Sequence, residues 1–356
     1  MRLIHAVTGL AAALVVTAAC AVAADPSVGW PAGVTPRVPL NFKIQPYARG
    51  LEGVSALLVL PNGDVLVAES RRGPVRSVAR VTLLRDTTGA GIADQSFELA
   101  GDIVAPFGLA LRRDRLFVAG GDGLWSCPYL VGQTRLHGAC RLQIAQAAAA
   151  GSGLAWSADE RRVIVAVEPS RALPGLYVAA ADGHDLAPLP GAPATAIGIA
   201  ISPVTGDAWT ALPSVAGTTS GARLGQVLGG DADARTEVAL GTDAVPRAIT
   251  FYGRSHFPRL HRGGLFVATE RSVLVAPFVD GHPTGAVEGF LDQFAAGPDA
   301  APYGRPTALA VGTDGALLVA DETTIWRVTF KCAACTPDPV PARRAPRPAV
   351  GPKDPG

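Results

Sequence analysis

Charged residues are scarce in this chain. They make up 17% of its 356 residues, and the formal net charge is only +1. Nucleic-acid binding requires a basic face with interleaved aromatic side chains, so a nearly neutral chain gives no case for a nucleic-acid partner. Lysine is almost absent, since the sequence contains only Lys43, Lys331 and Lys353. We attribute the preference for arginine to coding bias rather than to phosphate binding.

Familiar catalytic motifs are missing as well. The chain contains no Gly-x-Ser-x-Gly elbow, no His-Glu-x-x-His pair and no glycine-rich phosphate loop. It therefore carries no serine-hydrolase, zinc-protease or nucleotide-binding signature. Hydrophobic residues are abundant at 48%, together with 41 glycines and 30 prolines. This composition predicts a large core and frequent interruptions of any helix.

Residues 1–24 have the pattern of a secretory signal peptide. Arg2 precedes an apolar run, and small residues lead to a cleavage site after Ala23 or Ala24. The run is too short and too weakly flanked for a membrane anchor. Lipidation at Cys20 is the alternative, but the sequence TAAC lacks the leucine usual three residues before a lipidated cysteine. We therefore expect a secreted or periplasmic protein with no membrane span.

Export decides how the remaining cysteines are interpreted, because disulfides persist in oxidising compartments. Cys127 and Cys140 bracket a short loop with a central glycine, and we expect a disulfide between them. Cys332 and Cys335 form a CxxC with neither a helix start nor a second ligand pair nearby, so a structural or idle role is expected. Beyond them, Thr336–Gly356 is proline-rich and without an apolar pattern, which predicts a disordered tail.

A unit of two short apolar strands joined by a turn occurs six times, starting near residues 55, 107, 152, 197, 247 and 307. Each unit begins at a small residue, and these are Ala56, Gly108, Gly153, Gly198, Ala248 and Ala308. Their spacings are 52, 45, 45, 50 and 60 residues. A β-repeat of this length is typical of a propeller blade, so residues 40–330 are predicted to form an all-β, six-bladed propeller. A β-sandwich is the alternative, but sandwich strands carry no fixed long period.

The last unit also suggests how the ring closes. It contains strands expected at Thr307–Val311, Ala316–Ala320 and Ile325–Phe330. The alternating segment Leu40–Leu51 precedes the first unit and has no partner of its own. We expect it to add the outer strand to the sixth blade, which would leave no exposed edge.

Charged residues gather at one end of the predicted blades. The loop after each second strand opens on the same face as the loop before each first strand, which we call the mouth. Loops after second strands carry Glu69, Arg71, Asp122, Glu168, Arg171, Glu270, Arg271, Asp321 and Glu322, and Arg247 and Arg305 stand before first strands. Both signs converge, as a polar ligand would require. The alternative is that these charges only keep the rim solvated.

Three stretches of the repeats resemble a known family. They are FKIQPYARGLEGVSALLVLPNGDVLVAES at 42–70, AITFYGRSHFPRLHRGGLFVA at 248–268 and GRPTALAVGTDGALLVADETTIWRVTF at 304–330. They are similar to blades of the glucose/sorbosone dehydrogenases, and the resemblance extends roughly from Phe42 to Phe330. It implies an exported six-bladed propeller that binds pyrroloquinoline quinone (PQQ) and calcium and oxidises sugars. In that reaction a hydride passes from the sugar C1 to the quinone while a histidine takes the hydroxyl proton.

The chain departs from that family at the site itself. The family's histidine base is replaced within Ala147–Ala150, and its Arg-Asn pair falls near Ala194 and Thr195. Arg271, in the shortened segment Thr269–Ser272, could take the place of an arginine in the family motif. Arg305, in the sequence GRP, is the candidate for contact with an anionic ligand that best matches the family pattern. Arg247, Arg271 and Arg305 are thus the candidate cofactor-binding residues.

Calcium ligands are lacking too. The family's acidic loop becomes SVAGTTSGARLG, with no carboxylate, and another calcium turn retains only Asp86 and Asp94. These are too few oxygens for calcium, so no metal site is predicted. The histidines do not replace the lost base, since none precedes a channel-lining strand; they are His137, His184, His256, His261 and His282.

Two functions of different classes follow. The favoured one is a sugar-dehydrogenase-like propeller that binds a small polar molecule, such as a sugar, or a protein partner at its mouth, with the parent catalysis lost or altered. The other is an active PQQ-dependent sugar or aldehyde dehydrogenase. A lactonase is a third and weaker alternative, in which Glu69, Glu168, Glu270 and Asp321 would surround one divalent cation.

Overall fold

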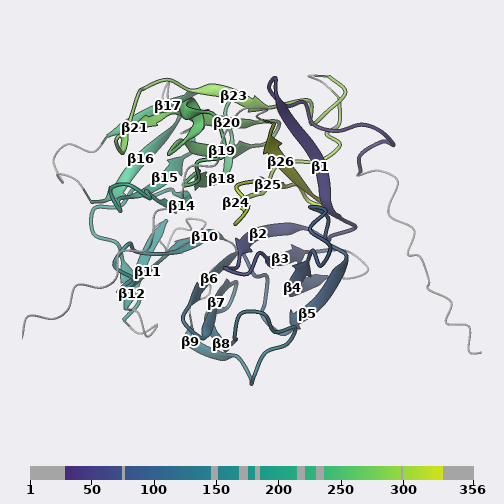
Figure 1. Cartoon of the computed structure of the whole chain (residues 1–356). Helices are drawn as coiled ribbons and strands as arrows, with labels where there is room; N and C mark the ends of the chain where they lie inside the picture. The colour runs from purple at the N-terminus through teal and green to yellow at the C-terminus, as the bar shows by residue number, and fades with distance from the viewer. Residues whose placement is uncertain are drawn as a thin grey trace, which may run out of the picture.

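The computed structural model describes residues 29–331, apart from 74–76, 146–150, 168–174, 181–184, 215–220, 230–235 and 298–299. Within these ranges the chain forms six four-stranded antiparallel sheets, arranged as the blades of a propeller (Figure 1). The predicted all-β, six-bladed fold is therefore confirmed. The predicted signal peptide, Cys20, Cys332, Cys335 and the proline-rich tail lie outside the described residues.

The first three blades follow chain order from inner to outer strand. Blade 1 consists of β2 (Val54–Val59), β3 (Val65–Arg71), β4 (Val78–Arg85) and β5 (Gln95–Ala100). Blade 2 consists of β6 (Gly108–Arg112), β7 (Arg115–Gly120), β8 (Gly123–Pro128) and β9 (Arg141–Ala145). Blade 3 consists of β10 (Gly151–Trp156), β11 (Arg162–Val167), β12 (Leu176–Ala180) and β13 (Ala187–Pro188).

The next two blades continue this order. Blade 4 consists of β14 (Ile197–Ile201), β15 (Ala208–Leu212), β16 (Ala222–Leu228) and β17 (Glu237–Gly241). Blade 5 consists of β18 (Pro246–Phe251), β19 (Leu265–Thr269), β20 (Val273–Ala276) and β23 (Glu288–Leu291). Two short additions interrupt it: the 3-10 turn η1 (Arg259–His261), and the small hairpin of β21 (Phe278–Val279) and β22 (His282–Pro283). No helix in the described ranges is long and apolar enough to cross a membrane.

Blade 6 closes the ring with strands from both ends of the chain. Its inner three strands are β24 (Ala308–Val311), β25 (Leu317–Ala320) and β26 (Thr324–Phe330). Its outer strand is β1 (Phe42–Arg49), which pairs antiparallel with β26 from Phe42↔Phe330 to Arg49↔Thr324. The predicted closure by the N-terminal strand is thus confirmed, and Figure 1 shows β1 lying along β26. The strand order in blade 6 is β1-β26-β25-β24, so β26 and β25 each have a hydrogen-bonded strand on both sides.

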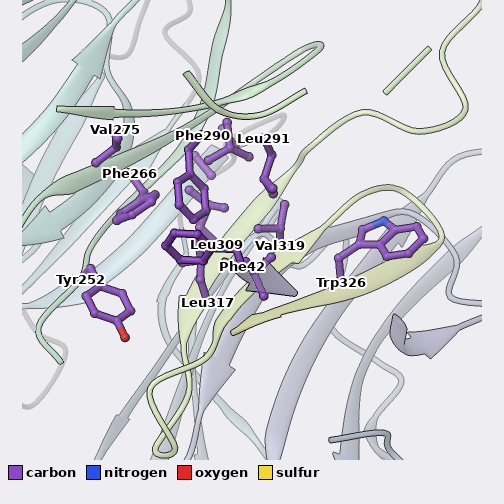
Figure 2. Packing of buried hydrophobic residues seen from close by; sticks show 14 of the residues in the cluster. Phe42, Tyr252, Phe266, Val275, Phe290, Leu291, Leu309, Leu317, Val319 and Trp326 are labelled. Carbon is purple, nitrogen blue, oxygen red and sulfur yellow. The ribbon is translucent and has the colours of Figure 1, made fainter. Parts of the chain in front are cut away.

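The core consists of layers between neighbouring blades. Six clusters of buried apolar side chains each join one blade to the next around the ring. In β3, Val65 and Val67 pack toward blade 6, whereas Leu66 packs toward blade 2. Since successive side chains of a strand point to opposite faces, a strand buried on both faces must be apolar at every position. This explains why the second strands of the repeats are apolar over most of their length; the exception in blade 4 is Thr210, whose hydroxyl donates to the carbonyl oxygen of Gly198 at 2.7 Å. Figure 2 shows the layer between blades 5 and 6, where Phe266 and Leu309 come from opposite blades.

Small residues at the start of each repeat allow the inner strands to meet. Inner strands lie against one another in the order β2, β6, β10, β14, β18, β24 and back to β2. A Cβ atom added at Gly108 would lie 2.7 Å from the Cβ of Leu154 on β10, and one at Gly153 would lie 3.0 Å from the nitrogen of Ile199 on β14. The repeated small residue is therefore a packing requirement at the narrow centre of the ring.

Candidate ligand-binding mouth

Three arginine–glutamate pairs lie at equivalent places on the mouth. Each joins a residue before or at the start of an inner strand to one at or just after the end of the next strand: Glu52 with Arg71, Arg247 with Glu270, and Arg305 with Glu322. The N–O distances are 2.9 Å for Arg247 and 3.3 Å for Arg305. The pairs belong to blades 1, 5 and 6, which are consecutive in the ring.

Blades 6 and 1 are also joined through the backbone at this end. The carbonyl oxygen of Glu322 accepts hydrogen bonds from the N–H groups of Gly53 at 2.8 Å and Val54 at 3.3 Å. The N–H of Leu51 donates to the carbonyl oxygen of Thr323 at 3.0 Å. The Glu52 and Glu322 loops are therefore held side by side, and the two ion pairs form one continuous polar edge.

The members of these pairs remain partly open to solvent. The arginine side chains are 36–49% exposed and the glutamates 21–43% exposed. Such pairs contribute little to folding stability, typically about 0–1 kcal/mol, because solvent screens them. Each offers N–H donors and carboxylate acceptors next to one another while its own charges cancel.

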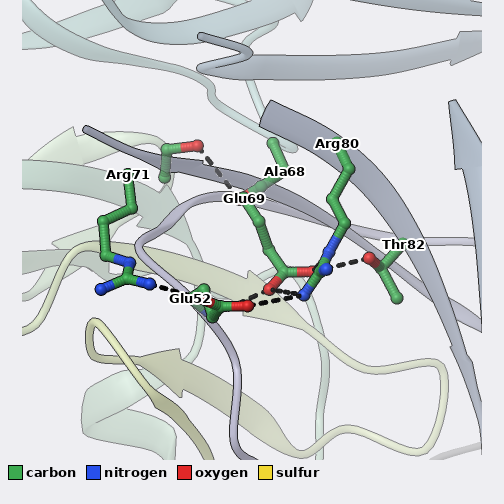
Figure 3. Close-up of polar contacts among 7 residues, drawn as sticks. Glu52, Ala68, Glu69, Arg71, Arg80 and Thr82 are labelled. Carbon is green, nitrogen blue, oxygen red and sulfur yellow. Dashed lines mark hydrogen bonds and ion pairs between the residues drawn. The ribbon is translucent and has the colours of Figure 1, made fainter. Parts of the chain in front are cut away.

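Glu69, expected at the rim, is instead fully buried. Arg80 donates to it through Nε at 2.8 Å and Nη2 at 2.9 Å, and the hydroxyl of Thr82 donates at 2.6 Å (Figure 3). The N–H of Glu52 adds a donor at 2.8 Å. The hydrogen bond to Glu69 also raises the pKa of Arg80 above its ordinary value. Glu69 differs from the expected open carboxylate because strand β4 supplies its partners, and its role is to position the Glu52 loop.

Asp321 is also fully buried and has its oxygens occupied. Its Oδ2 accepts the indole N–H groups of Trp30 at 2.6 Å and Trp326 at 3.0 Å. Its Oδ1 accepts the backbone N–H groups of Thr323 and Thr324, each at 2.8 Å. It therefore caps its own turn and secures the N-terminal segment, and it presents no free carboxylate to the mouth.

The other predicted rim residues differ in their surroundings. Arg271 is exposed and donates to the carbonyl oxygens of Gly297 at 3.3 Å and Ala300 at 3.5 Å. Asp122, on blade 2, accepts the indole N–H of Trp125 at 2.9 Å. Glu168, Arg171 and the segment Ala147–Ala150 lie outside the described residues. The structure thus brings together four of the predicted residues in paired form: Arg247 with Glu270 and Arg305 with Glu322.

Sequence reasoning missed Glu52 and Arg80, although Glu52 precedes its inner strand just as Arg305 does. Beside them a cavity of about 380 Å³ runs between the edge strand β1 of blade 6 and the outer strands of blade 1. Its polar lining includes Arg49, Arg80, Thr82, Gln95, Ser96 and Glu98. Donors and acceptors are again interspersed, so this groove suits a polar, uncharged guest better than an ion.

Within the described ranges, no three His, Cys, Asp or Glu side chains come together where they could hold a metal ion. Asp86, from the degenerate calcium turn, accepts the N–H groups of Gly89 at 2.8 Å and Gly91 at 2.6 Å. Partial burial works against ionisation, but these hydrogen bonds prevail and hold the pKa of Asp86 below its ordinary value. The predicted Cys127–Cys140 disulfide is present and joins β8 to the residue immediately before β9.

Among the histidines, His261 lies in the aromatic layer between blades 5 and 6, against Phe42 and Phe290. Burial lowers its pKa from the ordinary value, and Glu288 opposes this only in part. His256 lies against the turn at Gly315, which joins β24 to β25 on the face opposite the mouth. His184 lies outside the described residues. Neither His261 nor His256 is placed to act as a base at the mouth.

The described residues form a six-bladed propeller whose fold is similar to that of PQQ-dependent sugar dehydrogenases. No protein-family model matches the sequence, and no curated protein matches it. Among solved structures, a family AA12 carbohydrate-active enzyme of Trichoderma reesei is similar with a TM-score of 0.66 at 13% identity, over 87% of this chain and 100% of that one. The PQQ domain of a pyranose dehydrogenase from Coprinopsis cinerea has a TM-score of 0.61 at 14% identity, over 85% and 99% of the two chains.

A glucose dehydrogenase-type oxidoreductase from Thermus thermophilus is similar with a TM-score of 0.58 at 19% identity, over 81% of this chain and 99% of that one. At these identities the likeness establishes the fold. Any inference about function therefore rests on the residues at the mouth.

Proposed function

We propose that this propeller binds a small, uncharged, polyhydroxylated molecule of the sugar class at its mouth. The observation that carries the proposal is the set of three self-neutralising arginine–glutamate pairs on consecutive blades. Adjacent hydroxyl groups both donate and accept hydrogen bonds, so a guanidinium and a carboxylate side by side match a sugar diol. Hydrogen bonds to charged partners are the stronger ones, and these partners are already held in place by each other.

The residues present do not fit PQQ, the group found in some structures of similar fold. PQQ is a polycarboxylate and would need cations whose charge is not already balanced. Arg247 and Arg305 each have a glutamate partner, and Arg271 is engaged by carbonyl oxygens. The sequence also has Ala147–Ala150 where the family resemblance expects the histidine base. We therefore propose binding without hydride transfer to this quinone.

The test measures the melting midpoint of the purified protein with glucose, with a panel of oligosaccharides, and with PQQ, each with and without calcium. A ligand at about one hundred times its dissociation constant adds about 2.7 kcal/mol to the free energy of unfolding, which raises the midpoint by several degrees. We expect a saturable rise with a sugar and none with PQQ.

A matched pair of variants locates the site. Glu270→Gln should abolish the sugar-induced rise, because it removes a carboxylate acceptor from the mouth. Asp314→Asn is the control, since Asp314 lies in the turn between β24 and β25, at the end opposite the mouth, where it forms an ion pair with Arg327 and is about as exposed as Glu270. A rise with PQQ that depends on calcium would instead support the dehydrogenase, and no rise with any compound would overturn the proposal.

A further inference from the structure

A second polar site lies on blade 2, at the end opposite the mouth. The turn between β6 and β7 carries Arg112, Arg113 and Arg115, and β9 begins at Arg141. The four arginines line one cavity of about 360 Å³, together with Ser126 and Gln143. A volume of this order suits a small-molecule ligand.

The strand register explains why these side chains share one face. Arg112 pairs directly with Arg115, and Ser126 pairs directly with Arg141. Directly paired residues of neighbouring antiparallel strands point to the same side of a sheet, as do residues two apart in one strand. Phe117 lies two residues after Arg115, pairs with Ser126 and packs toward blade 3. Arg112, Arg115 and Arg141 therefore lie on the blade-3 side of blade 2, and Arg113 lies in the turn beside them.

The charges of this cluster are not balanced by the described part of the chain. Among the described residues that line the cavity, Asp114 is the only carboxylate. Across the described ranges, none of the four arginines forms an ion pair with an acidic side chain. Like charges directly opposite each other on paired strands are destabilising, so Arg112 opposite Arg115 costs folding stability. This contrasts with the mouth pairs, where each arginine has a glutamate.

Two donors without acceptors lie at or beside the cavity, one on Arg112, which lines it, and one on Trp156, which contacts Arg112. Arg112 is half-buried, and its guanidinium carbon lies 5.3 Å from the ring centre of Trp156. Its Nε and the indole Nε1 of Trp156 are both buried and have no hydrogen-bond partner within the described ranges. Buried donors are nearly always satisfied, so an unpaired donor beside a cationic cavity indicates an acceptor supplied from outside. Arg115 is already positioned, because its Nη1 donates to the hydroxyl of Ser126 at 2.9 Å.

We propose that this cavity, which we call the arginine pocket, binds a small oxyanion-bearing molecule with at least two negative charges. Guanidinium groups on one face present parallel N–H donors, the geometry that phosphate, sulfate and carboxylate oxygens accept. The bound anion relieves the repulsion between Arg112 and Arg115 and provides the missing acceptor for Arg112. The site is separate from the mouth, so it does not depend on the proposed sugar binding.

The experiment is a calorimetric titration of the full chain at constant ionic strength with inorganic phosphate, glucose 6-phosphate and citrate. We expect saturable binding of at least one of these probes. Tighter binding of glucose 6-phosphate than of phosphate would identify a phosphorylated sugar, and a preference for citrate would identify a polycarboxylate. Absence of saturable binding with all three probes overturns the proposal.

Variants test the location. The double variant Arg113→Gln/Arg141→Gln removes two exposed charges that form no ion pair in the described ranges, and it should raise the dissociation constant at least about tenfold. Arg161→Gln/Arg162→Gln is the matched control, since it removes two exposed arginines at the equivalent turn of blade 3, outside the pocket. Unchanged affinity in the double variant, or an equal loss in the control, would show that binding is general charge attraction and would overturn the proposal.

If the double variant changes the melting midpoint of the protein without ligand, the titration is repeated with the variant Arg112→Gln. It leaves Arg113 and Arg141 in place and removes the guanidinium that stacks on Trp156. The dissociation constant for the probe should rise by a similar factor, and an unchanged dissociation constant in Arg112→Gln would overturn the proposal.

Discussion

The indole N–H of Trp30 donates to Oδ2 of Asp321 at 2.6 Å, across 291 residues of sequence. The same oxygen accepts the indole N–H of Trp326 at 3.0 Å, so one buried carboxylate holds the N-terminal segment and the closing blade together. Trp30 also packs edge-on against Phe294 and Trp326. The ring is therefore secured twice by the N-terminal part of the chain, once by the β1 strand and once by Trp30.

We expect Trp30→Phe to lower the free energy of unfolding by about 1.5–3 kcal/mol, the worth of a hydrogen bond to a charged acceptor. Phenylalanine keeps most of the ring packing but has no N–H donor. Urea denaturation measures the change, with Trp125→Phe as the control, since its indole donates to the partly exposed Asp122. An equal loss in both variants would mean that burial of Asp321 adds nothing to this contact.

Glu69→Gln should cost about 3–5 kcal/mol of stability, because it leaves the buried part of Arg80 facing a neutral amide. Glu270→Gln, at the open mouth, should cost less than about 1 kcal/mol. The two variants separate a carboxylate that holds the fold from one that serves binding. Chemical denaturation of both in the absence of ligand makes the comparison, and a small loss for Glu69→Gln would contradict the positioning role assigned to it.

Gly108→Ala should destabilise the protein by about 1–3 kcal/mol through overpacking, since its Cβ would lie 2.7 Å from the Cβ of Leu154. The matched control is Gly289→Ala in the outer strand β23, where nothing lies within 4 Å of the new atom. Thermal melting of the two variants is the measurement. Equal midpoints would show that the inner strands can separate to admit a methyl group.

Reduction of the Cys127–Cys140 disulfide should lower the free energy of unfolding by about 3 kcal/mol, as expected for a bridge that closes a short loop. The sequence separation is 13 residues. Melting with and without a thiol reductant measures the effect. The double variant Cys127→Ala/Cys140→Ala is the control and should show no response to the reductant.

Stability should fall as the pH is lowered through about 6.5, the ordinary pKa of histidine. Burial lowers the pKa of His261 in the folded state, so the unfolded chain takes up this proton first. Because stability rises with pH wherever the unfolded state binds more protons, acid favours unfolding here. His261→Phe should flatten the dependence of the melting midpoint on pH between about 7.5 and 5.5. A variant slope equal to that of the wild type would assign the acid sensitivity to other groups.

Much of the fold could be predicted because each blade is formed by a short, continuous stretch of sequence, apart from the outer strand of blade 6. Two strands and a turn fit in a short stretch, so the six repeats and their small first residues are visible in order along the chain. The ring closure was also predictable, since Leu40–Leu51 alternates and has no neighbouring partner. The assignment of Glu69 and Asp321 to an open rim was not correct, because their burial depends on donors from other strands.

The sequence by itself thus established the blade number, the strand that closes the ring, and the loops that meet at the mouth, all of which follow from periodicity and local pairing. Only the tertiary structure decided what each charged side chain does there. Asp321 is satisfied by Trp30 from the far end of the chain, Arg247 is neutralised by Glu270, and Arg112 has no acidic partner in the described ranges. A charge is compensated by whatever lies within a few ångströms in space, and sequence distance carries no information about that.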